Sequence, residues 1–110
     1  MPATALPAPD PPTQVSPAGS RLPLPRGERT LFWIGRSPGS DIVINHPTVS
    51  RHHAELRRED CGWSLTDLWS TNGTRVNGWR ITSRCSVRPG DEVAFGDVIF
   101  QLVDEAGLLR

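Results

Sequence analysis

From residue 31 onward, the chain is a series of apolar stretches only three to seven residues long, separated by turn-forming residues. No window of 11 residues holds the 3.6-residue period of a helix, whereas the short stretches are those of β-strands. Strands this short and this closely spaced indicate an all-β sandwich or barrel. The expected strands span residues 31–35, 41–44, 54–57, 62–68, 74–76, 79–81, 92–95 and 98–103.

The dipeptide Asn77-Gly78 is the clearest turn signal in the chain and predicts a two-residue β-hairpin. Such a loop places Val76 opposite Trp79 and Arg75 opposite Arg80. The two arginines then share one face as opposed like charges, so that face is either solvated or meets an anion. Because side chains alternate across a strand, the other face is expected to join the core; its members are Thr74, Val76, Trp79 and Ile81.

Composition changes sharply near residue 22. Eight of the eleven prolines lie within residues 1–25, and the rest of that stretch is mostly small or polar. A segment of this kind cannot bury enough apolar surface to offset its chain entropy. We therefore expect a disordered Pro-rich tail over 1–21, a folded domain over 22–104 and a short C-terminal tail over 105–110. The spacing Pro9–Pro12 also fits an SH3-type ligand, although Pro-rich linkers produce it by chance.

Charge and hydropathy exclude several classes of protein. Twelve arginines and no lysine balance twelve acidic residues, so the basic excess of a nucleic-acid binder is missing. No apolar run approaches the roughly 20 residues of a membrane helix, and the amino terminus does not resemble a secretory signal. Cys61 and Cys85 are 24 positions apart without a CxxC pair, which favours two reduced, partly buried thiols over zinc or a disulfide. These features predict a cytoplasmic protein that binds neither nucleic acid nor membrane.

Three polar clusters lie at expected strand ends or turns, where a β scaffold presents binding groups. They are Gly35-Arg36-Ser37, Ser50-Arg51-His52-His53 and Ser70-Thr71-Asn72-Gly73-Thr74. Arginine offers a rigid fork of donors, serine and threonine offer hydroxyls, and glycine permits close approach of the backbone. Together they are suited to a tetrahedral oxyanion, while the amide of Asn72 is suited to a peptide main chain.

In order and spacing, these clusters resemble those of the forkhead-associated (FHA) domain, a phosphothreonine-binding module. The resemblance covers about residues 22–104 and implies a β-sandwich of two mainly antiparallel twisted sheets. It is carried by Ile34-Gly35-Arg36-Ser37, Ser40-Asp41-Ile42, Val49-Ser50-Arg51-His52-His53-Ala54, Trp63, Asp67-Leu68, Ser70-Thr71-Asn72-Gly73-Thr74, Val76-Asn77-Gly78, Gly90-Asp91 and Phe95-Gly96.

The resemblance also implies a role for each matching residue. Arg36 and Ser50 match the principal phosphate ligands, and the Thr71 hydroxyl adds to the phosphate shell. Arg51 matches a basic position beside the ligand, and Asn72 matches the side chain that bonds the ligand's main chain. The positions expected to brace the binding loops are Gly35, His53, Gly73 and Asn77.

Other interpretations use the same residues. Ser50, His53 and Asp67 are the residue types of a catalytic triad, but no nucleophile elbow surrounds the serine, so we expect no enzyme. His52 and His53 would point to opposite sides of a strand, which argues against metal. No cofactor is expected. A phospho-independent interaction domain of the same fold is the remaining alternative, and the intact phosphate-binding pattern argues against it.

The resemblance implies a phosphothreonine-containing partner, which would be a Ser/Thr kinase or its substrate. The chain's own tail is a second candidate, because Thr4 and Thr13 lie on a flexible segment long enough to reach the site. Trp69 directly precedes the third cluster, where a turn seldom buries a tryptophan. We expect its ring to lie partly exposed as a rim contact for the ligand, or else to cover a neighbouring loop.

Overall fold

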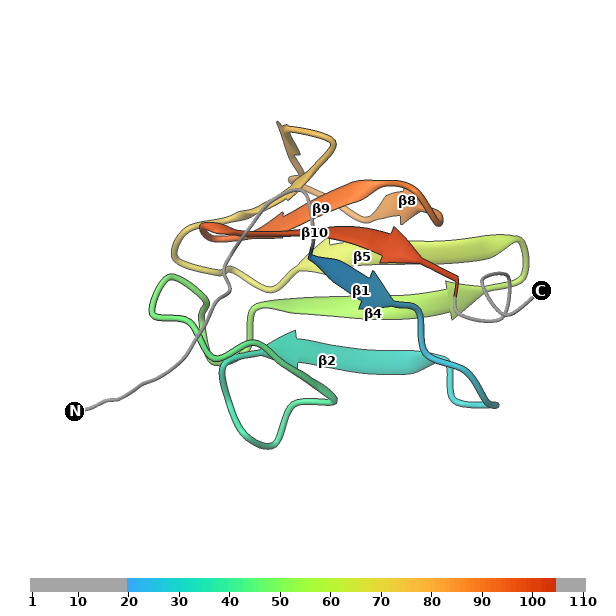
Figure 1. Cartoon of the computed structure of the whole chain (residues 1–110), viewed down its shortest axis with the longest axis horizontal. Coiled ribbons are helices and arrows are strands. Elements are labelled where there is room, and N and C mark those ends of the chain that lie inside the picture. Colours follow the sequence, from blue (N-terminus) through green and yellow to red (C-terminus); the bar gives the residue numbers. More distant parts are fainter. Residues whose placement is uncertain (1–19, 105–110) are drawn as a thin grey trace.

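The computed structural model describes residues 20–104, which form two five-stranded sheets facing each other (Figure 1). The first sheet has the order β1 (Arg21–Pro23), β10 (Val98–Val103), β9 (Glu92–Phe95), β6 (Thr74–Val76) and β7 (Trp79–Arg80). The second has the order β3 (Ile42–Val43), β2 (Leu31–Gly35), β4 (Ala54–Glu59), β5 (Gly62–Asp67) and β8 (Cys85–Val87). Only β1–β10 and β2–β3 pair in parallel. The predicted all-β sandwich of mainly antiparallel sheets is therefore confirmed.

All eight expected strands are present, and four of them have the predicted bounds. The sequence analysis missed the two edge strands β1 and β8. Strand β1 is only three residues long and contains Pro23, which a sheet accommodates at an edge because proline cannot donate to the ladder. Strand β8 is also only three residues long, too short for the alternation of Cys85, Ser86 and Val87 to mark it as a strand.

The core lies between the sheets and is built from alternating positions of the central strands. Phe95, Ile34, Leu56, Leu65 and Leu102 are all almost fully buried. The buried positions of β2 and β4 alternate with more exposed ones, as expected for strands with one face against the core. This packing fixes the strand ends that carry the polar clusters.

The Asn77-Gly78 hairpin forms in the predicted register, with Val76 opposite Trp79 and Arg75 opposite Arg80. Both turn residues have positive φ, 51° for Asn77 and 87° for Gly78, as a type I′ turn requires. The expectation that Trp79 joins the core is wrong, because its side chain is 79% exposed. Strand β7 is the last strand of its sheet and is only two residues long.

Both cysteines are free thiols, and Cys61 is exposed, contrary to the expected partial burial. Within residues 20–104 there is no helix of the length and apolarity needed to cross a membrane. Strand β1 begins at Arg21, one residue before the expected domain start. The predicted tail lies outside the described residues up to position 19, and so do the segment 105–110, Thr4 and Thr13.

Candidate functional site

The three polar clusters meet at one end of the sandwich, where β2 and β5 end and β4 and β6 begin (Figure 1). Main-chain hydrogen bonds join the first two, since the amide of Arg36 donates to the carbonyl of Ser50 at 3.0 Å. The third is joined through side chains. The amide of Thr71 donates to Ser50 Oγ at 3.0 Å, and Asn72 Nδ2 donates to the carbonyl of Thr48 at 2.8 Å.

Arg36 is exposed, and only one nitrogen of its guanidinium is used within the described structure. Its Nε donates to the carbonyl of Val49 at 3.0 Å, which fixes the direction of the side chain and leaves both terminal nitrogens for a ligand. Because Ser50 Oγ accepts the Thr71 amide, its own hydrogen remains available to donate. Arg51 and Thr71 are also exposed at this end. The structure thus brings the predicted phosphate-binding groups to one surface.

Gly35 brings the first two clusters into contact. A methyl group added at this position would lie 1.9 Å from the carbonyl oxygen of Arg51, and backbone cannot yield that much space. The close approach also lets the amide of Ser37 donate to the same carbonyl at 3.2 Å. Glycine is therefore required at this position for packing.

His53 links the second and third clusters from beneath. It is fully buried, its Nδ1 accepts the Ser50 amide at 3.0 Å, and its Nε2 donates to the carbonyl of Gly73 at 2.9 Å. These partners need a neutral ring with the proton on Nε2, because a second proton would face the Ser50 amide. Burial accordingly lowers the pKa of His53, and the bond to Gly73 only partly opposes that effect. His53 thus joins the two clusters through both of its ring nitrogens.

Asp67 also joins parts of the site, although the sequence analysis gave it no role beyond the family resemblance and a rejected catalytic triad. Its Oδ1 accepts the hydroxyls of Ser70 at 2.5 Å and Thr74 at 2.7 Å, and its Oδ2 accepts the Ser70 amide at 3.2 Å. Burial alone would raise the pKa of Asp67, but these hydrogen bonds outweigh it and lower the pKa. The spacing of Asp67 and Ser70, which suits a side-chain-closed turn, is the signal that could have revealed it.

The same contacts correct the expectation for Ser70. Its hydroxyl donates to Asp67 and accepts the amide of Gly73 at 2.9 Å, and the side chain is buried. Ser70 therefore shapes the third cluster and does not present a hydroxyl to a ligand.

A catalytic triad is absent from this geometry. His53 contacts the amide of Ser50 and not its hydroxyl, while Asp67 bonds to Ser70 and Thr74. A serine nucleophile needs its own hydroxyl against the histidine and the acid on the far ring nitrogen. The three residues instead hold loops in place.

The role predicted for Asn77 needs a correction. Its Oδ1 accepts the amide of Glu92 at 2.9 Å, and its Nδ2 donates to Asp91 at 3.2 Å. Asn77 thus fixes the β6–β7 turn against the start of β9, at the opposite end of β6 from the three clusters. Gly73 does lie in the binding loops, with φ of 88° and its carbonyl bonded to both His53 and the amide of Gly96.

Trp69 is 98% exposed and has a positive φ of 57°. The alternative that its ring covers a neighbouring loop is therefore wrong. A non-glycine residue in the left-handed region is uncommon, and an exposed indole gains nothing from packing. Trp69 stands at the start of the third cluster with its whole ring accessible.

Thr48 is a further residue of the site that sequence reasoning missed. Its carbonyl orients Asn72, while its hydroxyl accepts the amide of Asp97 at 2.9 Å and bonds His46 Nδ1 at 2.8 Å. It thus connects the loop before β4 to the β9–β10 turn. Nothing in its local sequence distinguishes this threonine from others.

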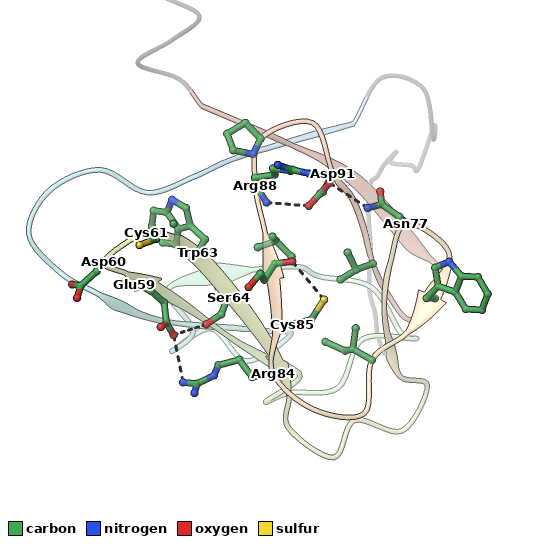
Figure 2. Close-up of a pocket in the computed structure, with 17 residues that line it drawn as sticks. Glu59, Asp60, Cys61, Trp63, Ser64, Asn77, Arg84, Cys85, Arg88 and Asp91 are labelled. Carbon is green, nitrogen blue, oxygen red and sulfur yellow. Dashed lines mark hydrogen bonds and ion pairs between the residues drawn. The ribbon is translucent and has the colours of Figure 1, made fainter.

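A groove of about 1080 Å³ lies elsewhere, between the edge strands β7 and β8. Figure 2 shows Glu59 in this groove between Ser64 and Arg84, with Asn77, Arg88 and Asp91 on another side. None of the predicted phosphate-binding residues lines it. The candidate site is consequently a surface of loops and is separate from the groove.

Comparisons with known sequences agree with this arrangement. The sequence model of the FHA domain matches residues 32–96. The chain is 44% identical over 86 residues to the oxoglutarate dehydrogenase inhibitor of Corynebacterium diphtheriae, covering 78% of this chain and 56% of that protein. It is 42% identical over 86 residues to the glycogen accumulation regulator GarA of Mycobacterium tuberculosis, covering 78% and 49%. The chain thus spans about half the length of these curated relatives.

Solved structures show the same fold. The FHA domain of CT664 from Chlamydia trachomatis superposes with a TM-score of 0.65 at 32% identity, over 74% of this chain and 80% of that one. EmbR of Mycobacterium tuberculosis, in complex with a low-affinity phosphopeptide, superposes with a TM-score of 0.62 at 35% identity, over 66% and 19%.

Proposed function

The chain belongs to the FHA domain family, and from that premise we propose that it is a phosphothreonine-dependent protein-interaction module. The ligands we assign to the phosphate are Arg36, Ser50, Arg51 and Thr71, with Asn72 bonding the main chain of the partner. No catalytic step is assigned, because the histidine and carboxylate nearest the site are both occupied as braces.

One observation carries the proposal: the loop end gathers cationic and hydroxyl donors that the rest of the described chain does not neutralise. Within residues 20–104, the ion pairs are Arg29–Asp41, Arg57–Glu55 and Arg84–Glu59. Arg36 and Arg51 take part in none of them. A phosphothreonine brings about −1.5 to −2 charge and three acceptor oxygens, which match these free donors.

We assign the threonine preference to the extra methyl group of the ligand. Its burial and the restriction of χ1 favour phosphothreonine over phosphoserine by up to about 1 kcal/mol. Paired titrations with the two phosphopeptides would measure this difference.

We propose that the partner is a Ser/Thr kinase or a protein that such a kinase phosphorylates, met in the cytoplasm. Support comes from relatives that are named as a regulator and as an enzyme inhibitor, and from a relative solved with a phosphopeptide. The tail threonines Thr4 and Thr13 are further candidate ligands once phosphorylated, because tethering gives a high effective concentration. Trp69 is proposed to contact side chains of whichever peptide is bound.

The test is a titration of the whole chain with a phosphothreonine peptide library and with the unphosphorylated twin of each peptide that binds. Two or more charged hydrogen bonds to phosphate predict a loss of about 100-fold or more without the phosphate. Equal binding of both twins would contradict the proposal and favour the phospho-independent module. Titrating a chain phosphorylated at Thr13 against one that starts at Ser20 would test self-binding, which predicts weaker peptide binding by the phosphorylated chain.

A further inference from the structure

Arg75 and Arg80 face each other on the outer side of the β6–β7 hairpin, and the proposed phosphate site uses neither of them. Directly opposed like charges destabilise a strand pair unless something compensates them. Arg75 is partly compensated, because its Nη2 donates to the carbonyl of Gly96 at 3.0 Å. Within the described chain, the guanidinium of Arg80 forms no hydrogen bond or ion pair.

The side chain of Arg80 nevertheless has a defined place, against the main chain of Gly73. A methyl group added to Gly73 would lie 2.9 Å from Nε and 3.3 Å from Nη2 of Arg80. Gly73 directly follows Thr71 and Asn72 in the third cluster. The guanidinium therefore packs beside the residue that is placed to bind the main chain of a ligand.

The nearby carboxylates leave this charge uncompensated. Asp67 lies beneath the third cluster and is occupied by Ser70 and Thr74, the latter fully buried. Asp97 reaches the same end of the molecule through its amide bond to Thr48, but it forms no ion pair with Arg80. The guanidinium of Arg80 packs on the backbone without an acidic partner, and it is therefore able to bind an acidic group of a ligand.

We propose that Arg80 forms a subsite for an acidic side chain of the phosphothreonine ligand, on the side of the site where Asn72 lies. This inference rests on the proposed function, because it requires a bound phosphopeptide to deliver the carboxylate. A guanidinium binds a carboxylate through two parallel hydrogen bonds, so the contact selects both charge and direction. Packing against Gly73 restricts the side chain before binding, which lowers the entropy lost on contact.

The experiment uses the whole chain and a phosphothreonine peptide that binds it. Each position flanking the phosphothreonine holds Asp in one peptide and Asn in its twin. The wild-type chain is expected to prefer Asp at one or two positions by about threefold to tenfold, the range for a partly exposed charge pair with good geometry. In Arg80→Gln that preference disappears, so the affinities for the Asp peptide and its Asn twin come within about twofold of each other.

The matched control is Arg88→Gln, which removes the same charge from an exposed arginine that lines the groove. It should keep the Asp preference, and thermal melting should show both variants folded. The inference is overturned if the wild type binds the peptide without any Asp preference, or if the preference survives in Arg80→Gln. Failure of every phosphothreonine peptide to bind the wild type would instead overturn the proposed function, and this inference with it.

Discussion

The loop end of the sandwich and the groove between β7 and β8 differ in how their charged side chains are paired. At the loop end, carboxylate and imidazole groups bond to hydroxyls and main chain, and arginines are left unpaired above them. At the groove between β7 and β8, Glu59 accepts both Ser64 at 2.9 Å and Arg84 at 3.4 Å (Figure 2). The groove thus holds a carboxylate that is paired with an arginine, whereas Arg36 and Arg51 at the loop end take part in none of the ion pairs of residues 20–104. This difference in pairing, and not concavity, is the reason for which we place the proposed anionic ligand at the loop end.

The largest expected effect compares one carboxylate from each end. Asp67→Ala should lower the free energy of unfolding by about 2–4 kcal/mol, because it leaves the buried hydroxyls of Thr74 and Ser70 without an acceptor. Glu59→Ala leaves a single buried hydroxyl, that of Ser64, without its acceptor, and the exposed position of Glu59 lets water take the place of the carboxylate, so the loss should be only about 1 kcal/mol. Denaturant unfolding measures both. Equal losses would show that the loop end is not braced as described.

The next effect compares one arginine from each end. Arg36→Ala should weaken phosphopeptide binding at least about tenfold, since it removes charged hydrogen bonds to the phosphate. Arg88→Ala removes the same charge at the groove and should change affinity by less than about twofold. Calorimetric titration of both variants with one phosphopeptide is the measurement. Unchanged affinity of Arg36→Ala would remove Arg36 from the site.

A smaller difference is expected between the two most exposed tryptophans, Trp69 at 98% and Trp79 at 79%. Trp69→Ala should weaken phosphopeptide binding by about twofold to fivefold, the range for an aromatic contact at the rim. Trp79 lines the groove, so Trp79→Ala should leave the phosphopeptide affinity unchanged. Quenching of the remaining tryptophan fluorescence would report each titration. If only Trp79→Ala weakens binding, the ligand contacts the groove.

The smallest expected effect is a pH dependence that belongs to the loop end. Burial lowers the pKa of His53 in the folded chain, so the unfolded chain takes up a proton more readily below its ordinary pKa of 6.5. The stability that neutral His53 contributes is complete above pH 6.5 and is lost as the pH falls below it. Asp67 adds a second loss, below 3.8, because its pKa is lowered too.

The measurement is denaturant unfolding between pH 5 and 8. His53→Gln should flatten the decline in that range, whereas His52→Gln, at an exposed neighbouring position, should not. A decline that persists in His53→Gln would assign the effect to another group.

Much of this fold could be predicted, because the turn dipeptides and short apolar stretches act locally. Asn77-Gly78 fixed the hairpin register down to Arg75 opposite Arg80. The exposure of Trp79 could not be predicted, because its place in the alternation of side chains is that of a core residue. In the structure, Trp79 lies on an edge strand of only two residues. Strand β1 was missed because its pairing with β10 joins the two ends of the domain.

The candidate site was predictable to the extent that the residues proposed to bind the ligand lie in short sequence motifs. Arg36, Ser50, Thr71 and Asn72 were all identified before their loops were placed. The braces were harder, since the part played by Asp67, Thr48 or Arg80 depends on contacts between segments distant in the sequence. The opposite error was made at Asn77. It lies within the family motif and was expected to brace the binding loops, but it accepts the amide of Glu92.

The most direct test of the central claim is to follow backbone amide chemical shifts of the labelled chain during titration with a phosphothreonine peptide. The account predicts the largest changes at residues 35–37, 50–51 and 71–73, with little change at 79 and 85–87. It also predicts that the unphosphorylated peptide leaves the chemical shifts of all of these amides unchanged. Changes concentrated at the β7–β8 groove, or an equal response to the unphosphorylated peptide, would contradict it.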